Sequence, residues 1–262
     1  MKKIKKTEVP GEGELIIGRQ PVLEELLQGN LYKVYMVAGQ KGKTINMISR
    51  KARQQGLPLR IIPREELDSL AGGGNHQGVA ALAPPFSYLS LRELLERLKA
   101  VTKDPFLVIL DHLQDPQNFG SLLRTADAAG MHGVIIPEDR SVKITPAVRK
   151  VAAGAAGRLP VARVVNLVNA IQQLKDEGFW IYGAEAGGTL PYYRVNYRGP
   201  FALVVGSEGK GLSRLLRDRC DGIIFIPMRG SVGSLNAAVA GAVIIYAAAA
   251  QREDWVNRTP GE

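Results

Sequence analysis

The sequence predicts an α/β protein in which a small α/β domain precedes a larger domain built on a parallel sheet. Short apolar segments alternate with helix-like segments along the chain, and some of them, such as 106–110 and 201–205, contain no polar residue. Strands buried on both faces form such continuous apolar runs. Their alternation with helices is typical of a parallel sheet that is covered on both sides.

The first folded domain is expected at residues 14–83, after a basic, flexible tail at residues 1–13. It contains, in order, a helix with proline in its first turn, a strand, a basic helix, a second strand and a closing strand. The expected ranges are 21–27, 34–37, 45–55, 59–62 and 79–82.

Prolines then separate the two domains. Pro84-Pro85 interrupts regular structure, and Asp104-Pro105 ends a short amphipathic helix at residues 91–98. We therefore place a linker at residues 84–104 and the second domain at residues 105–262. The expected strands of the second domain are 106–110, 133–136, 180–184, 201–205 and 223–226, and its expected helices are 121–129, 146–153, 167–175, 212–219 and 235–250.

The composition indicates a globular protein with a polyanionic partner. The 262 residues are 45% hydrophobic and 23% charged, which excludes a disordered, collagen-like or disulfide-stapled chain. The net charge of +9 suits nucleic acid. With a single cysteine, Cys220, and no apolar run of about 18 residues, we expect a cytoplasmic protein without a membrane span.

Ligands of parallel sheets bind beyond the carboxyl ends of the strands, so chemistry is expected in the loops after 106–110, 201–205 and 223–226. The first of these loops holds Asp115-Pro116-Gln117-Asn118-Phe119-Gly120. Asn118 is a candidate helix N-cap, and Arg124, one turn beyond Ser121, can lie near the same loop. The alternative is a capped helix whose arginine is only a surface residue.

The second loop is rich in glycine and reads Gly206-Ser207-Glu208-Gly209-Lys210-Gly211. Such a loop lets backbone amides approach a ligand closely. Leu212 stands where a Walker loop requires lysine, and the spacing differs from the dinucleotide fingerprint. Glu208 would repel a phosphate, which favours a cation or a group that pairs with a carboxylate. The alternative is a tight structural turn.

The third loop runs from Pro227-Met228 to Ser234-Leu235-Asn236. Ser234 is a candidate N-cap for the helix that follows. That helix is apolar on all faces, so it is expected in the core or in a subunit interface. Capping by Ser234 leaves the polar Asn236 at the start of an apolar helix without an explanation.

Other chemistries find little support in the sequence. His76, His112 and His132 show no metal-ligand spacing, and no nucleophile elbow or Ser-His-Asp set is present. We expect each histidine to be a hydrogen-bonded structural residue, Cys220 to be an inert buried thiol, and no metal to be bound.

Together, the three loops resemble the three signature motifs of the SpoU (TrmH) family of SPOUT-class RNA 2′-O-ribose methyltransferases, over residues 106–250. Residues 14–83, with His76-Gln77-Gly78-Val79, resemble the L30e/L7Ae-like substrate-binding domain of the RlmB-type branch, which methylates a guanosine in 23S rRNA. The sequence departs from the family pattern at Gly233, often Glu, and at Ala237-Ala238, often Val-Ser or Ala-Ser.

The resemblance implies a trefoil-knotted second domain, a homodimer and S-adenosylmethionine as the cofactor. It implies that Arg124 engages the target ribose and the neighbouring phosphate. Asn118 and Glu208 would orient Arg124 and the ribose, and Ser234 and Asn236 would shape the pocket. An arginine is too basic to accept a proton, so Arg124 is expected to stabilise the developing alkoxide. The implied cofactor-binding residues are Gly206, Gly211, Ile226, Pro227, Met228 and Leu235.

Basic residues of both domains are candidates for contact with the RNA backbone. Two alternatives to 23S rRNA methylation stay open: methylation of tRNA or of another rRNA site, and a catalytically silent RNA-binding or ribosome-assembly factor on the same scaffold. The candidate RNA contacts are Lys41, Lys43, Arg50, Lys51, Arg53, Arg140, Lys143, Arg149, Lys150 and Arg158.

Overall fold

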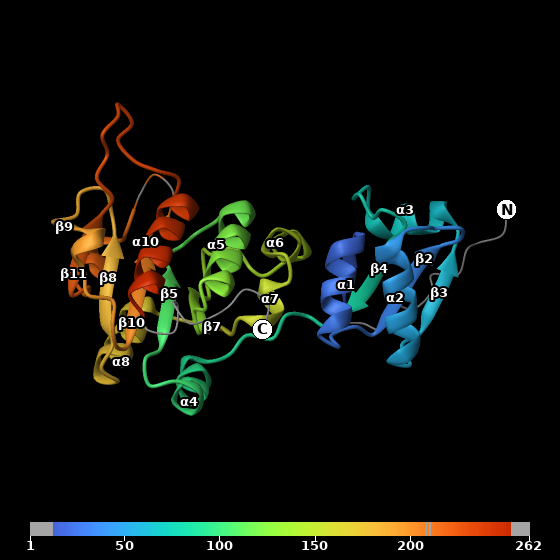
Figure 1. Cartoon of the computed structure of the whole chain (residues 1–262), viewed down its shortest axis with the longest axis horizontal. Helices are drawn as coiled ribbons and strands as arrows, with labels where there is room; N and C mark the ends of the chain where they lie inside the picture. Colours follow the sequence, from blue (N-terminus) through green and yellow to red (C-terminus); the bar gives the residue numbers. More distant parts are fainter. Residues whose placement is uncertain (1–12, 208, 210, 253–262) are drawn as a thin grey trace. The chain divides into compact units, whose positions relative to one another are not determined.

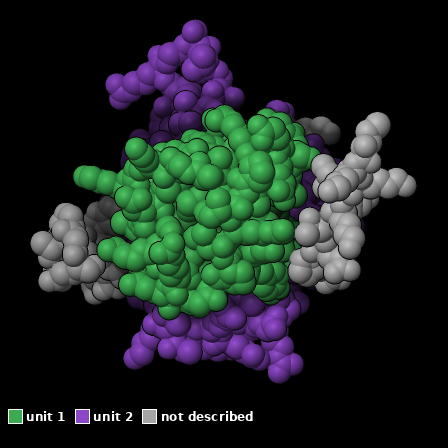
Figure 2. Space-filling view, turned by 90° about the vertical axis from the view of Figure 1, so that its right-hand side faces the viewer, with its two compact units in different colours: residues 1–87, 144–157 green, residues 88–143, 158–262 purple. Residues whose placement is uncertain are grey.

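The computed structural model describes residues 13–207, 209 and 211–252. The chain divides into two compact units, coloured separately in Figure 2. Unit 1 contains residues 1–87 and 144–157, and unit 2 contains residues 88–143 and 158–262. The segment 144–157, which we expected in the second domain, belongs to unit 1 because its helix α6 (Pro146–Ala152) packs against a strand and a helix of that unit.

Unit 1 is a four-stranded sheet with helices on both faces (Figure 1), which confirms the predicted small α/β domain. The strand order is β1-β4-β2-β3, with β2 and β3 parallel and the other pairs antiparallel. One face packs on α1 and α2, and the other on α3. The elements are β1 (Glu14–Ile17), α1 (Arg19–Leu27), β2 (Lys33–Val37), α2 (Lys43–Gln54), β3 (Leu59–Ile62), α3 (Arg64–Ala71) and β4 (Val79–Ala83).

A buried arginine ties α6 into unit 1. The Arg149 side chain is 6% exposed, and its Nη1 donates to Glu25 Oε1 at 2.9 Å. Its Nη2 lies 3.4 Å from Glu14 Oε2, and its guanidinium lies over the Phe86 ring. This burial corrects the expectation that Arg149 contacts RNA, because the guanidinium is enclosed between two carboxylates of its own unit. The neighbouring Lys150 is exposed.

Unit 2 is a seven-stranded sheet in which every pair of neighbouring strands is parallel, as predicted. The strand order is β7-β6-β5-β10-β8-β11-β9. The strands are β5 (Phe106–Leu110), β6 (Gly133–Pro137), β7 (Val161–Val164), β8 (Trp180–Ala184), β9 (Leu190–Pro191), β10 (Phe201–Val205) and β11 (Gly222–Phe225). All residues of β5, β6 and β10 are buried, which explains their apolar sequences.

Helices cover both faces of this sheet (Figure 1). One face packs on α4 (Leu91–Val101), α8 (Leu167–Asp176) and α9 (Arg214–Arg217). The other face packs on α10 (Ala237–Gln251), which lies against α5 (Pro116–Ala128). A short helix, α7 (Ala155–Arg158), precedes β7, and a 3₁₀ turn, η1 (Tyr192–Arg194), follows β9.

The predicted linker therefore contains a helix of the second core. Three leucines of α4, Leu91, Leu94 and Leu98, are buried against the sheet of unit 2. Ser90 and Glu93 form a capping box that fixes the start of this helix. Pro84 and Pro85 follow β4 and lie within unit 1, whose first segment ends at Ser87. The amphipathic helix that follows them packs on the sheet of unit 2.

The enclosed Arg149 predicts a large and pH-dependent stability effect. Arg149→Ala leaves two carboxylates without their cation, and we expect a loss of about 3–5 kcal/mol in a urea unfolding experiment. Burial raises the pKa of Glu14, while Arg149 opposes this rise. A raised folded-state pKa means that stability falls as pH rises above the ordinary carboxyl value, so the loss should shrink in acid.

The matched control is Lys150→Ala, which removes an exposed cation from the same helix. This variant should unfold within about 0.5 kcal/mol of the parent chain. Equal stability of the two variants would contradict a structural role for Arg149.

Candidate active site

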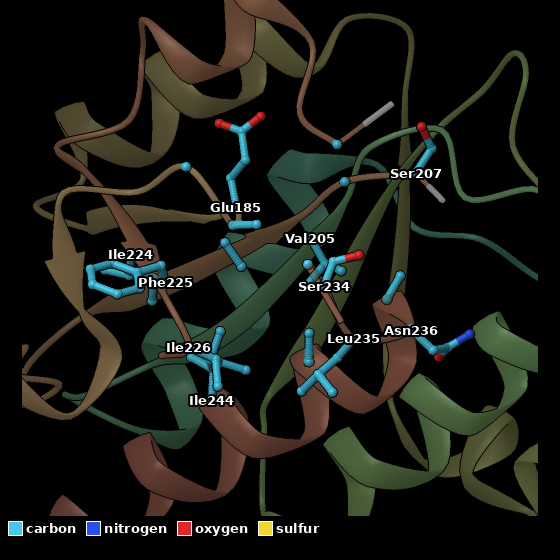
Figure 3. A pocket seen from close by; sticks show the side chains of 18 of the residues that line it. Glu185, Val205, Ser207, Ile224, Phe225, Ile226, Ser234, Leu235, Asn236 and Ile244 are labelled. Carbon is cyan, nitrogen blue, oxygen red and sulfur yellow. The ribbon is translucent and has the colours of Figure 1, made fainter. Parts of the chain in front are cut away.

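A pocket of about 720 Å³ lies beyond the carboxyl ends of β10, β8 and β11, three adjacent strands of unit 2 (Figure 3). The segments that follow these strands line it, and the start of α10 closes it. In Figure 3, Ile226, Leu235 and Ile244 gather in the lower part of the view, and Glu185 and Ser207 lie in the upper part. The pocket therefore combines an apolar side with a polar side, as binding sites for small organic molecules do.

The structure brings most of the sequence-predicted site residues together at this pocket. Asn118, Arg124 and Pro227 are not among the residues that line it. Glu208 lies outside the described residues. The predicted residues that line the pocket are Gly206, Gly211, Ile226, Met228, Ser234, Leu235 and Asn236.

The second loop folds back on itself at the pocket. Gly211 N donates to Ser207 O at 3.0 Å, and Gly209 and Gly211 have positive φ angles of 76° and 64°. A Cβ atom on Gly206 would lie 2.3 Å from the carbonyl carbon of Gly211. Since real Cβ atoms do not approach a backbone so closely, only glycine fits at position 206. The loop is therefore a tight turn, and it also lines the pocket.

Two helix caps differ from the prediction. Asp115, not Asn118, caps α5, because its carboxylate accepts from the backbone N of Gln117 and of Asn118. Asn236, not Ser234, caps α10, because its Oδ1 accepts from Ala238 N at 2.9 Å and from Val239 N at 3.3 Å.

The Asn236 cap explains the polar residue at the start of an apolar helix, and it also connects two motifs. While Oδ1 caps α10, Nδ2 donates to Asn118 Oδ1 at 3.0 Å. The side chain points toward the neighbouring helix in Figure 3. One side chain thus holds the first motif on α5 against the third motif at the pocket.

Arg124 lies on α5, six residues after Asn118, which is about 9 Å along the helix axis. Its side chain is exposed. The structure shows no hydrogen bond or ion pair between Arg124 and any residue within 13–207, 209 and 211–252. The exposed Arg124 side chain can be reached from solvent.

Glu185 and Arg217 line the pocket and were missed by the sequence analysis. Glu185 follows β8, and its Oε2 lies 3.0 Å from Arg217 Nη1. The strand 180–184 was predicted, and a charged residue directly after a predicted strand, here Glu185, could have indicated a site residue. It was overlooked because the sequence does not show that β8 lies between β10 and β11 in the sheet.

The histidines and the cysteine have structural roles, as expected. His76 bonds to Asp68, His112 bonds to Asp111, and His132 Nδ1 accepts from Phe106 N. Burial raises the pKa of the Cys220 thiol to about 12, so it stays protonated and unreactive.

The described part of the chain contains neither a metal-binding cluster nor a membrane-spanning helix. Among these residues, no group of three or more His, Cys, Asp or Glu side chains is placed to hold a metal ion. No described helix is both long enough and apolar enough to cross a membrane.

The two hydrogen-bonding roles of Asn236 can be separated by substitution. Asn236→Ala removes the cap of α10 and should lower the free energy of unfolding by about 1 kcal/mol. Asn236→Asp keeps an oxygen that caps the helix but loses the donor to Asn118, so its stability should stay close to that of the parent chain. Urea unfolding measures both variants, and an equal loss for the two would contradict the capping role.

The fold and the pocket define a class of protein: a parallel α/β domain with a ligand site at its strand ends, joined to a small α/β domain. Residues 105–246 match the SpoU rRNA Methylase family, and residues 15–89 match a domain described as RNA 2′-O ribose methyltransferase substrate binding. The chain belongs to the SpoU family of RNA methyltransferases.

Two relatives are similar over almost the whole chain. A protein of Staphylococcus haemolyticus, whose name places it in the TrmH family of tRNA/rRNA methyltransferases, is 44% identical over 90% of this chain and 94% of its own length. YacO of Bacillus subtilis, named for the same family, is 39% identical over 89% of this chain and 94% of its own length.

A solved structure shares the fold of both parts. The SpoU methyltransferase AviRb from Streptomyces viridochromogenes, in complex with the cofactor AdoMet, superposes with a TM-score of 0.77 and 25% identity. The superposition covers 91% of this chain and 90% of AviRb. The expected SpoU family and the expected α/β fold with a parallel sheet and a preceding small α/β domain are thereby confirmed.

Proposed function

We propose that this protein transfers a methyl group from S-adenosylmethionine to the 2′-oxygen of a ribose in RNA, and that its substrate is a guanosine of 23S rRNA in the cytoplasm. The observation that carries the proposal is the pocket at the ends of β10, β8 and β11, which gathers the second and third motifs in one site. The trefoil knot implied by the resemblance stays a prediction.

The pocket residues fit an adenosine-based cofactor. A volume of about 720 Å³ lies within the range of cofactor sites. Ile226, Leu235 and Ile244 offer an apolar surface for a flat base, and Glu185 offers a carboxylate for hydroxyl or cationic groups. We assign the holding of the cofactor to this pocket, through the predicted residues that line it: Gly206, Gly211, Ile226, Met228 and Leu235. Pro227, which was predicted with them, does not line the pocket.

When bound, S-adenosylmethionine supplies an electrophilic methyl group on a sulfonium. The protein must place the 2′-hydroxyl in line with this group and assist the loss of its proton. Arg124 cannot accept that proton, because a guanidinium stays charged in proteins. We assign to Arg124 the stabilisation of the developing alkoxide, while an RNA phosphate or a water molecule takes the proton.

The remaining polar residues position these parts. The hydrogen bond between Asn236 and Asn118 joins the pocket to the helix that carries Arg124. Ser234 shapes the pocket wall, and Glu208 is assigned the orientation of Arg124 and the ribose.

Arg124→Ala is expected to abolish methyl transfer, with a loss of at least about a hundredfold, since it removes charge stabilisation in the transition state. Cofactor binding, measured by calorimetry, should stay nearly unchanged, because Arg124 does not line the pocket. Arg92→Ala, at an exposed arginine of α4, is the control. Full activity of Arg124→Ala would contradict the assigned role.

We further propose that the chain acts as a homodimer through α10. This helix is apolar from Ala237 to Ala250, and Val239 and Tyr246 on its outer side are 49% and 42% exposed, with Val243 between them. Exposed apolar patches of this kind mark interaction surfaces.

The dimer is tested by adding charge to the outer side of α10. Val239→Asp combined with Tyr246→Asp should yield monomers in sedimentation experiments, because association would bury two unpaired carboxylates per chain. Val165→Asp adds one carboxylate at an apolar residue of unit 2 that is 85% exposed and not on α10, and it should leave the dimer intact. A parent chain that sediments as a monomer would refute the proposal.

The substrate is identified by labelled methyl transfer to unmodified 23S rRNA, 16S rRNA and tRNA in parallel, with mapping of the modified ribose. Label at one 2′-oxygen of 23S rRNA is the expected result. Label on tRNA alone would overturn the substrate and keep the chemistry. Cofactor binding without label on any RNA would favour the silent binding factor.

We propose that basic residues of α2, together with Lys41 just before this helix and Lys150 on α6, contact the RNA backbone. Lys41, Lys43, Arg50 and Arg53 are exposed, and Lys51 is half-buried. RNA affinity should therefore fall steeply as salt concentration rises, and a flat salt profile would argue against phosphate contacts.

A further inference from the structure

Unit 1 contains a second, strongly polar pocket that is separate from the pocket of unit 2. Its volume is about 330 Å³. Four segments meet there: the start of α1, the residues before α2, the outer side of α3, and the loop before β4. The lining residues are Arg19, Gln40, Arg64, Asp68, Gly73, Gly74, Asn75, His76, Gln77 and Gly78.

The wall of this pocket is held in place by a buried histidine. His76 is 4% exposed, its Nε2 lies 2.7 Å from Asp68 Oδ1, and its Nδ1 accepts from Gly78 N at 3.0 Å. Between His76 and Gly78, Gln77 adopts a positive φ of 52°, which is uncommon for a residue other than glycine. Backbone held in such conformations is found preferentially at ligand sites.

Arg19 presents a fixed guanidinium to the pocket. Its Nε donates to Gln77 O at 3.0 Å and its Nη2 donates to Gln40 Oε1 at 2.9 Å. An arginine has five N–H donors, so three have no partner among the described residues. A guanidinium that is already oriented in this way suits a planar, two-pronged contact with a phosphate.

Further positive groups surround this arginine. A Cβ atom on Gly42 would lie 3.5 Å from Arg19 Nη1, so the start of α2 is next to the guanidinium. No side chain caps α2 and its first turn has no acidic residue, which leaves its N-terminal amides for an anion. Lys41 and Lys43 lie next to Gly42, at the start of α2. Arg64 is 70% exposed, and its Nε lies 3.9 Å from Asp68 Oδ2.

The other side of the pocket carries both donors and acceptors. Asn75, Gln77 and Asp68 are exposed. Gln77 Oε1 already accepts from Arg19 N at 3.2 Å, so this side chain offers its NH₂ group as a donor. Asp68 Oδ1 is held by His76, and its other oxygen, Oδ2, faces Arg64. A site that binds only phosphate does not need amide and carboxylate side chains. A site that recognises the edge of an unpaired base does, because these side chains form hydrogen bonds with that edge. A base in a duplex has its Watson–Crick edge engaged and cannot offer it to these side chains.

We propose that this pocket of unit 1 binds one unpaired nucleotide of the substrate RNA. The phosphate lies against Arg19 and the N-terminus of α2, and the base edge lies against Asn75, Gln77 and Asp68. The inference rests on the proposed RNA methyltransferase function, which it deepens by specifying a recognition site in unit 1, distinct from the methyl-transfer pocket of unit 2. The pocket thereby selects RNA with an accessible, unpaired nucleotide.

The test compares the affinities of the full chain for two labelled RNAs of equal length, a hairpin with an unpaired loop and a blunt duplex. Fluorescence anisotropy without methyl donor measures both. Arg64→Ala and Arg19→Lys, which keeps the charge but loses the planar fork, should each weaken hairpin binding about tenfold and duplex binding little. Arg92→Ala removes an exposed arginine with the same i,i+4 ion pairing, and it should change neither affinity.

Each other outcome overturns part or all of the proposal. Equal weakening of hairpin and duplex would show a phosphate contact without a nucleotide pocket. Unchanged affinities for Arg64→Ala and Arg19→Lys would remove the pocket from RNA binding. Since Arg64 is an exposed surface residue, its variant still tests the proposal if Arg19→Lys fails to fold. Retained pocket-dependent binding without methyl transfer would refute the proposed function alone.

Discussion

The close approach of two backbone segments at Gly206 and Gly211 is the constraint on which the site depends. A Cβ atom at position 206 would lie within 2.3 Å of the carbonyl carbon of Gly211. Because no side chain intervenes, the loop after β10 folds sharply and leaves room for a pocket above the strand ends. A larger residue at position 206 would push the two segments apart and move the second motif away from the third. The pocket needs both motifs, because residues of both line it.

The order of the strands turns separate loops into one site. β10, β8 and β11 are neighbours although they are not consecutive along the chain, so the residues after each strand meet at one edge. Asn236 then adds the first motif, since its side chain caps α10 and bonds to Asn118 on α5 at the same time. The positions of the polar groups thus follow from backbone packing and helix capping.

Strands 106–110 and 201–205 could be predicted because both of their faces are buried and their sequences are uniformly apolar. They match the structure residue for residue, as does 180–184, which is only partly buried. β1, β7, β9, α3 and α7 were missed: β9 has two residues, and α3 starts after a proline without a side-chain cap. Glu185 and the burial of Arg149 depend on sheet order and on contacts between distant segments. The motifs were recognisable because their residues are contiguous.

The most direct test of this account is calorimetric titration of S-adenosylmethionine into the full chain and into two glycine variants. Gly206→Ala places a methyl group against the Gly211 backbone, and we expect binding to be lost. Gly230→Ala, in the third loop but not among the residues that line the pocket, has open space around it and should bind as the parent chain does. Parent-like binding by Gly206→Ala would contradict the claim that this backbone contact forms the cofactor site.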